Sequence, residues 1–265
     1  MLNAVDRRRV ARALSAIESG TATARELLCG IPDRAVPAHR IGITGAPGAG
    51  KSTLTALLVR ELRGRGLRVA VLAVDPSSPF SQGALLGDRL RMREVAGDEG
   101  VFIRSMATRG AQGGLSRAVA DAGEVLEAAG FDTILIETVG VGQSEYDIMR
   151  VADTTLLVLT PESGDEVQMA KAGLMEIADI FVLNKSDRPD SDALWAALCG
   201  MLEGRAQGAA PGSWRPPVVR TVASSAGGGD ELVRAILAHG DYQRERGGLE
   251  RRRLARRAEG PGGRP

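Results

Sequence analysis

The sequence predicts an α/β fold built on a doubly wound, mostly parallel sheet. From His39 onward, short apolar runs alternate with longer segments of helical character. Most of these runs are apolar at consecutive positions, which is typical of strands buried on both faces. The segments between them are long enough for right-handed crossovers. We therefore expect one α/β domain over residues 39–239, with short helical extensions at both ends.

Residues 1–38 are expected to form the N-terminal extension. Four apolar residues recur there at near-helical spacing: Val5, Val10, Leu14 and Ile17. The segment TARELLCG, residues 23–30, predicts a second short helix that stops at Gly30.

Seven apolar runs are the expected strands. They are RIGIT (40–44), RVAVLAVD (68–75), VFIRS (101–105), DTILIET (132–138), TTLLVLT (154–160), DIFVLN (179–184) and PVVRTVAS (217–224). Segments such as SRAVADAGEVLEAAG (116–130) predict the crossover helices.

Residues 240–265 are expected to form an arginine-rich helical arm and a flexible tail, with a helix from about Leu249 to Ala258. One such run is more often a solvated helix than an RNA-binding element. The formal net charge of +1 and the 3% aromatic content also disfavour nucleic acid as a partner.

Composition narrows the class of protein further. The apolar runs are shorter than a membrane span, and the chain begins without an apolar segment, so we expect no membrane association and a cytoplasmic location. Cys29 and Cys199 are isolated, which favours two reduced thiols. His39 and His239 are the only histidines, which excludes a His-rich metal site.

The stretch GAPGAGKS, Gly45 to Ser52, fits the pattern G-x-x-x-x-G-K-[ST] at every required position. Its glycines allow backbone N–H groups to close round a phosphate, and Lys51 is expected to reach the β- and γ-phosphates. The Ser52 hydroxyl is expected to ligate Mg²⁺. The expected nucleotide contacts here are Gly45, Ala46, Pro47, Gly48, Ala49, Gly50, Lys51 and Ser52.

The sequence NKSD follows a later predicted strand and indicates guanine recognition. The carboxylate of Asp187 can accept hydrogen bonds from the ring N–H and the exocyclic amine of guanine, a donor pair that adenine lacks. Asn184 is expected to support the base and the loop, and the stem of Lys185 to cover the face of the base. Together the two motifs predict GTP rather than ATP.

The run ETVG lies between these motifs, at the end of the strand 132–138. Glu137 is expected to orient Mg²⁺ or its water, although many GTPases have Asp there, and the Gly140 N–H is expected to sense the γ-phosphate. Gln143 either positions water or is a bystander. With Lys51, these residues are the expected catalytic set, acting by in-line attack of water on the γ-phosphate.

The residues alone leave the roles of two acids and two arginines undecided. Asp75 is either a metal ligand or a turn former, and Asp88 is either a ligand or a helix cap or surface acid. Arg104 and Arg109 are candidates for the group that completes hydrolysis, with a structural role favoured for each.

The chain resembles the GTPases associated with methylmalonyl-CoA mutase, the MeaB or ArgK type. The resemblance is carried from about residue 5 to 255 by GITGAPGAGKST, AVDPSSPFSQGALLGDRLRM, FIRSMATRGAQGGLS, ILIETVGVGQSE, GDEVQMAKAG and EIADIFVLNKSD. It implies Mg²⁺ held among Ser52, Asp75, Asp88 and Glu137, and phosphates on residues 48–53, which adds Thr53.

The resemblance also implies that Ala223, Ser224 and Ser225 close over the guanine. It further implies that residues 160–173 form a switch that carries the nucleotide state to a partner. The charged residues that could make this coupling are Asp165, Glu166 and Lys171. From the residues alone, that acidic segment would be an ordinary helix cap.

The implied role is that of a chaperone for an adenosylcobalamin-dependent acyl-CoA mutase. GTP binding and hydrolysis would gate cofactor loading, the chain itself would hold no cobalamin, and a homodimer is expected. The resemblance implies a longer dimer-building arm than residues 240–265, and Gln112 stands where an apolar residue is expected. The alternatives are a metallochaperone GTPase for a nickel enzyme and a GTP-dependent kinase of transport components.

Overall fold

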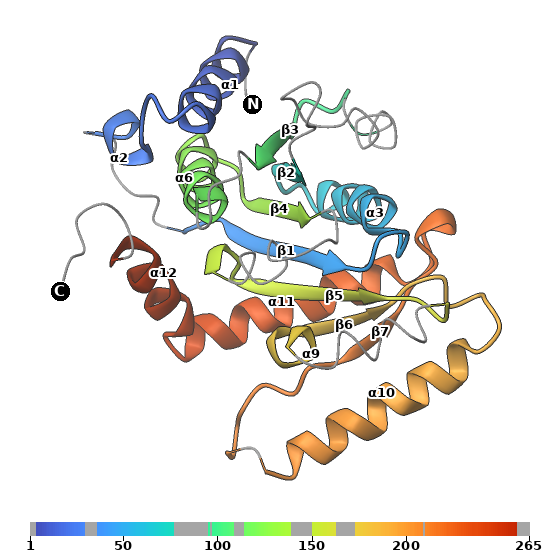
Figure 1. Ribbon diagram of the computed structural model, residues 1–265. Coiled ribbons are helices and arrows are strands. Elements are labelled where there is room, and N and C mark those ends of the chain that lie inside the picture. The colour runs from blue at the N-terminus through green and yellow to red at the C-terminus, as the bar shows by residue number, and fades with distance from the viewer. Residues whose placement is uncertain are drawn as a thin grey trace.

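The computed structural model describes residues 4–29, 36–76, 95, 97–108, 114–138, 150–162, 173–208 and 210–258. Its centre is a seven-stranded sheet in the order β3-β2-β4-β1-β5-β6-β7, flanked by helices (Figure 1). Every strand pair in this sheet is parallel, so the expected mostly parallel sheet is parallel throughout. The order reverses on either side of β1, as in doubly wound folds.

Each predicted strand is present. They are β1 (His39–Gly45), β2 (Val69–Pro76), β3 (Val101–Thr108), β4 (Thr133–Thr138), β5 (Thr154–Leu159), β6 (Ile180–Leu183) and β7 (Val218–Arg220). All residues of β4, β5 and β6 are buried, which confirms that the continuous apolar runs mark strands covered on both faces. Strand β7 is shorter than expected because the chain turns after Arg220 into the short helix η1 (Ala223–Ser225).

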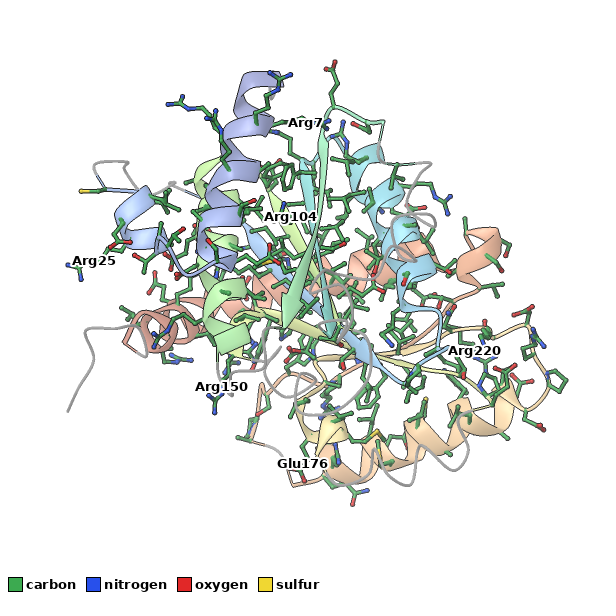
Figure 2. The ribbon with its side chains drawn as sticks, turned by 45° about the horizontal axis from the view of Figure 1, so that its top comes forward. Arg7, Arg25, Arg104, Arg150, Glu176 and Arg220 are labelled. Atoms are coloured by element: carbon green, nitrogen blue, oxygen red, sulfur yellow. The ribbon has the colours of Figure 1, made fainter. Side chains whose placement is uncertain are left out.

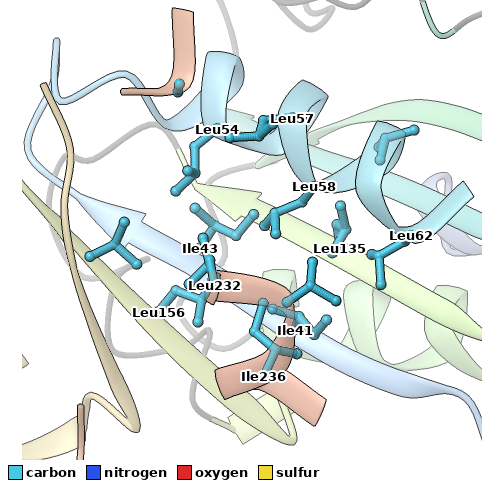
Figure 3. Packing of buried hydrophobic residues seen from close by; sticks show 14 of the residues in the cluster. Ile41, Ile43, Leu54, Leu57, Leu58, Leu62, Leu135, Leu156, Leu232 and Ile236 are labelled. Atoms are coloured by element: carbon cyan, nitrogen blue, oxygen red, sulfur yellow. The ribbon is translucent and has the colours of Figure 1, made fainter. Parts of the chain in front are cut away.

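Helices α3 (Lys51–Gly64) and α11 (Gly229–Glu245) cover one face of the sheet. Figure 3 shows leucines of α3 meeting Ile41 and Ile43 of β1, with Leu232 and Ile236 of α11 beside them. The other face is covered by α6 (Gly114–Ala128), α9 (Leu174–Ile177) and α10 (Ser191–Ala206).

The N-terminal residues form two helices, as expected. Val10, Leu14 and Ile17 of α1 (Ala4–Glu18) are buried against α6 and the sheet. The short α2 (Ala24–Leu27) begins with a capping box between Thr23 and Glu26.

The C-terminal arm contains α12 (Gly248–Ala258), within one residue of the expected start. Helix α11 runs through the predicted domain boundary at residue 239, and the three-part division of the chain stays a prediction. No helix in the described ranges is both long and apolar enough to cross a membrane.

Candidate functional site

The glycine-rich loop lies where β1 leaves the carboxyl edge of the sheet. Gly45 has a φ of 140°, and a Cβ at this position would lie 2.2 Å from the Val158 carbonyl oxygen of β5. Gly50 has a φ of 87°, and a Cβ there would lie 2.5 Å from Nδ2 of Asn184. Both positions therefore require glycine, for backbone conformation and for space. Helix α3 begins directly after the loop, so its N-terminus points toward it.

Lys51 and Ser52, in the first turn of α3, are buried beside the loop. The Lys51 ammonium donates to the carbonyl oxygens of Gly45 at 2.7 Å and Ala46 at 2.9 Å. The Ser52 hydroxyl donates to Oε1 of Glu137 at 2.6 Å. The structure thus gathers a buried cation, a hydroxyl and a carboxylate at the start of one helix.

Glu137 comes from β4, whose residue pairing places it beside Ile43 of β1. Its second oxygen, Oε2, accepts a hydrogen bond from Thr55 at 2.8 Å. Asp75 lies two residues beyond Ala73, the β2 partner of Glu137, so its backbone reaches the same edge of the sheet. The Ser52 hydroxyl and the Glu137 carboxylate are oxygen donors of the kind that Mg²⁺ prefers, so these described residues fit this ion.

Asn184, after β6, joins the glycine-rich loop to a second loop. Its Nδ2 donates to the Ala49 carbonyl oxygen at 2.8 Å, while its Oδ1 accepts from the Thr221 hydroxyl at 3.1 Å and the Ala223 N–H at 3.2 Å. The side chain is buried. Asn184 therefore fixes the candidate phosphate loop against the candidate base loop.

Most of the other base-loop residues lie near solvent at the same edge. Lys185 has a φ of 55°, a left-handed conformation that is uncommon for a residue with a side chain. Asp187 is exposed, as are Ser224 and Ser225, whereas Ala223 is buried. These residues and the glycine-rich loop lie at the carboxyl ends of β1, β5, β6 and β7, on one side of the reversal in strand order.

Several predicted residues lie outside the described part of the chain. They are Asp88, Arg109, Gln112, Gly140, Gln143, Asp165, Glu166 and Lys171, together with the side chain of Asp75. Arg104, labelled in Figure 2, is described. Its guanidinium donates to Glu18 at 2.6 Å and to Ser15 at 3.2 Å. It holds α1 against β3, which is the structural role favoured from the sequence.

Sequence reasoning missed two residues of this site. Thr55 bonds Glu137, and Thr221 bonds Asn184. The position of Thr55, three residues after Ser52 on one face of a helix, is a signal that could have found it. No pattern in the sequence connects Thr221 to Asn184.

The two histidines, distant in sequence, meet at the opposite edge of the sheet. Nε2 of His39 and Nδ1 of His239 each lie 2.7 Å from the Thr154 hydroxyl. Within the described ranges, no three His, Cys, Asp or Glu side chains are placed to hold a metal ion together. We read the His39–Thr154–His239 cluster as part of the packing of the amino edge.

A parallel, doubly wound sheet with a G-x-x-x-x-G-K-[ST] loop between its first strand and the next helix defines a P-loop nucleotide-binding protein. The family model for the methylmalonyl-CoA mutase-associated GTPase MeaB matches residues 10–260. The chain belongs to this family, as the motifs indicated, and is a GTPase.

Two relatives illustrate the similarity. A protein of Pyrococcus abyssi that carries a GTPase name is 50% identical over 251 residues, which span 95% of this chain and 78% of that protein. The methylmalonic aciduria type A homolog of Mus musculus, a mitochondrial protein, is 42% identical over 199 residues. That match spans 73% of this chain and 47% of the mouse protein.

A solved structure is similar in fold along nearly the whole chain. The crystal structure titled LAO/AO transport system kinase superposes with a TM-score of 0.72 at 29% sequence identity. The match covers 98% of this chain and 83% of that one.

Proposed function

We propose that this GTPase is a chaperone of an adenosylcobalamin-dependent acyl-CoA mutase of the methylmalonyl-CoA mutase type. GTP binding and hydrolysis gate the loading of the mutase cofactor and the protection or reactivation of the mutase. The observation that carries the proposal is the family match over residues 10–260. The mouse relative, named for methylmalonic aciduria, supports the same client.

In this proposal the phosphates lie on residues 48–53, and Lys51 neutralises charge that develops on them. The contact between Ser52 and Glu137 supports a Mg²⁺ site there, which Asp75 and Asp88 complete. When bound, Mg²⁺ supplies charge neutralisation at the β- and γ-phosphates. Gly140 reports γ-phosphate occupancy, and Gln143 is the candidate for positioning water.

The base is proposed to lie over Lys185, with Asp187 at its donor edge and residues 223–225 closing over it. The buried bonds of Asn184 support this placement, because they hold the two loops at a fixed separation. Adenine would leave the Asp187 carboxylate without its two donors, which selects guanine.

Coupling to the mutase is proposed to run through Asp165, Glu166 and Lys171. The chain itself binds no cobalamin, works in the cytoplasm and pairs with a second copy. Neither nucleic acid nor a membrane is a partner in this proposal.

The test is the rate of GTP hydrolysis by the pure protein, alone and with an adenosylcobalamin-dependent acyl-CoA mutase from the same source. We expect slow hydrolysis alone, strong stimulation by the mutase and no comparable activity with ATP. Lys51→Ala is the matched control for contaminating hydrolase. Hydrolysis that no such mutase stimulates would overturn the chaperone proposal while leaving the GTPase in place.

Two other outcomes point to the alternative functions. GTP-dependent activation of a nickel enzyme would favour a metallochaperone, although the isolated Cys29 and Cys199 offer no paired thiols to hold nickel. Transfer of the γ-phosphate of GTP to a transport protein, followed by radiolabel, would favour a kinase.

A further inference from the structure

The carboxylate of Glu162 lies at the same edge of the sheet as the candidate base loop. Leu159, the last residue of β5, pairs with Leu183 of β6, and its carbonyl oxygen accepts the Asn184 N–H at 2.8 Å. Glu162 follows Leu159 by three residues, and Lys185 follows Leu183 by two. Because β5 and β6 are parallel neighbours, Glu162 and Lys185 both follow strand ends at the same edge of the sheet.

Glu162 contacts both cations of the base loop. Its Oε2 accepts a hydrogen bond from the Lys185 ammonium at 2.8 Å, and its Oε1 lies 3.7 Å from Nη1 of Arg188. The hydrogen bond from Lys185 is the main reason that the pKa of Glu162 lies below its usual range. The carboxylate thus stays ionised near neutral pH.

Lys185 has a long side chain that lies near solvent. Its backbone is left-handed, and its side chain is one-third exposed, so without a partner the long stem would sample several rotamers. A stem fixed in advance loses less conformational entropy when a base packs against it. The backbone of residue 184 is already tied to Leu159, and the Glu162 contact holds the long Lys185 side chain beside that tie.

We propose that Glu162 is a positioning residue for guanine nucleotides: it holds Lys185 in the orientation that covers the face of the base, and so slows nucleotide release. The inference rests on the proposed placement of guanine at residues 184–187. Glu162 acts through Lys185 and touches neither the base edge nor the phosphates. Its effect is therefore the same for every purine whose face packs on the lysine stem.

The experiment compares release of methylanthraniloyl-labelled GDP and IDP from the full chain, wild type and Glu162→Gln. Hypoxanthine has the ring face of guanine but lacks the exocyclic amine. We expect Glu162→Gln to release both nucleotides faster by the same factor, about two- to five-fold, because exposed ion pairs of this kind are weak. Raising the salt concentration should narrow the difference from wild type.

The matched control is Glu61→Gln, the same change in a carboxylate that pairs with Arg65 at 3.2 Å in the last turn of α3. It should release both nucleotides at the wild-type rate. A double-mutant cycle supplies the second readout: in a Lys185→Gln background, Glu162→Gln should add nothing. Unchanged release from Glu162→Gln, or an equal effect in the Lys185→Gln background, would overturn the inference.

Failure of this inference differs from failure of the base assignment. Asp187→Asn should change the ratio of GDP to IDP release, whereas Glu162→Gln should leave that ratio unchanged. If Asp187→Asn leaves the ratio unchanged, the proposed base site is wrong. If only Glu162→Gln is silent, the site stands and the positioning role is wrong.

Discussion

The two edges of the central sheet both carry buried polar clusters, yet they are built differently. At the carboxyl edge, the Lys51, Ser52 and Glu137 cluster comes from the first turn of one helix and the end of one strand. At the amino edge, the His39–Thr154–His239 cluster joins the starts of β1 and β5 to the middle of α11. One edge is made of recognisable motifs, and the other of residues that no motif connects.

The amino edge is also enclosed by Trp214 and by the C-terminal arm. The Trp214 ring packs on His239 with centroids 4.8 Å apart, and Arg253 of α12 donates to the Ala38 carbonyl oxygen at 2.8 Å. Arg253 also lies 3.5 Å from the buried carboxylate of Asp153. These contacts tie α12 to the amino ends of β1 and β5.

The difference separates two uses of buried polar groups. At the carboxyl edge, glycines bring the backbone close to its neighbours and a helix N-terminus faces the loop, which suits an anionic ligand. At the amino edge, an arm is packed over the cluster. We therefore expect changes at the first edge to alter catalysis and changes at the second to alter stability.

Lys51→Ala is expected to have the largest effect. Removal of the cation that faces the candidate phosphate loop should lower the rate of GTP hydrolysis by about 100- to 1,000-fold. The free energy of unfolding should change far less. Single-turnover hydrolysis and urea unfolding of the same preparation measure the two quantities. Hydrolysis at the wild-type rate would show that the carboxyl edge is not the catalytic site.

The pH dependence of the free energy of unfolding should depend on the buried His39 at the amino edge. Burial lowers the pKa of His39 to about 4, with the nearby His239 also lowering it and Asp153 raising it. Between about pH 6.5 and pH 4 the unfolded chain therefore binds more protons than the folded one, so stability falls as the pH falls through this window. The loss from this histidine is about 3 kcal/mol at most.

Urea unfolding at a series of pH values measures that loss, and His39→Gln should flatten the slope between pH 6.5 and pH 4. An equally steep slope in the variant would assign the pH dependence to other groups.

Asp187→Asn should weaken GTP binding by about 10- to 100-fold, because the amide cannot accept both guanine donors. Titration calorimetry with GTP, and with xanthosine triphosphate in competition, checks this expectation. Xanthine has a carbonyl where guanine has its amine, so its relative affinity should rise. An unchanged preference for guanine would move base recognition away from this loop.

Thr154→Val is the smallest and most selective change. It removes the hydroxyl that both histidines contact, so the free energy of unfolding should fall by about 1–2 kcal/mol. GTP hydrolysis should keep the wild-type rate, because the residue lies at the amino edge. A loss of hydrolysis in a folded variant would contradict the assignment of catalysis to the carboxyl edge and of stability to the amino edge.

Much of the fold was predictable because its signals are local. Continuous apolar runs identified the seven strands, and the phosphate loop was evident from the spacing of its glycines, Lys51 and Ser52. The strand ends were less predictable. The early end of β7 at Arg220 depends on the turn into η1 and on the bonds of Asn184, which the sequence does not show.

The sequence by itself determined the phosphate loop, the guanine motif and the buried parallel sheet, because each depends on the chemistry of adjacent residues. Only the tertiary structure decided which distant groups meet: Thr55 with Glu137, Thr221 with Asn184, Glu162 with Lys185, and His39 with His239 through Thr154. The physical reason is that strand order and pairing bring together residues with no fixed separation along the chain.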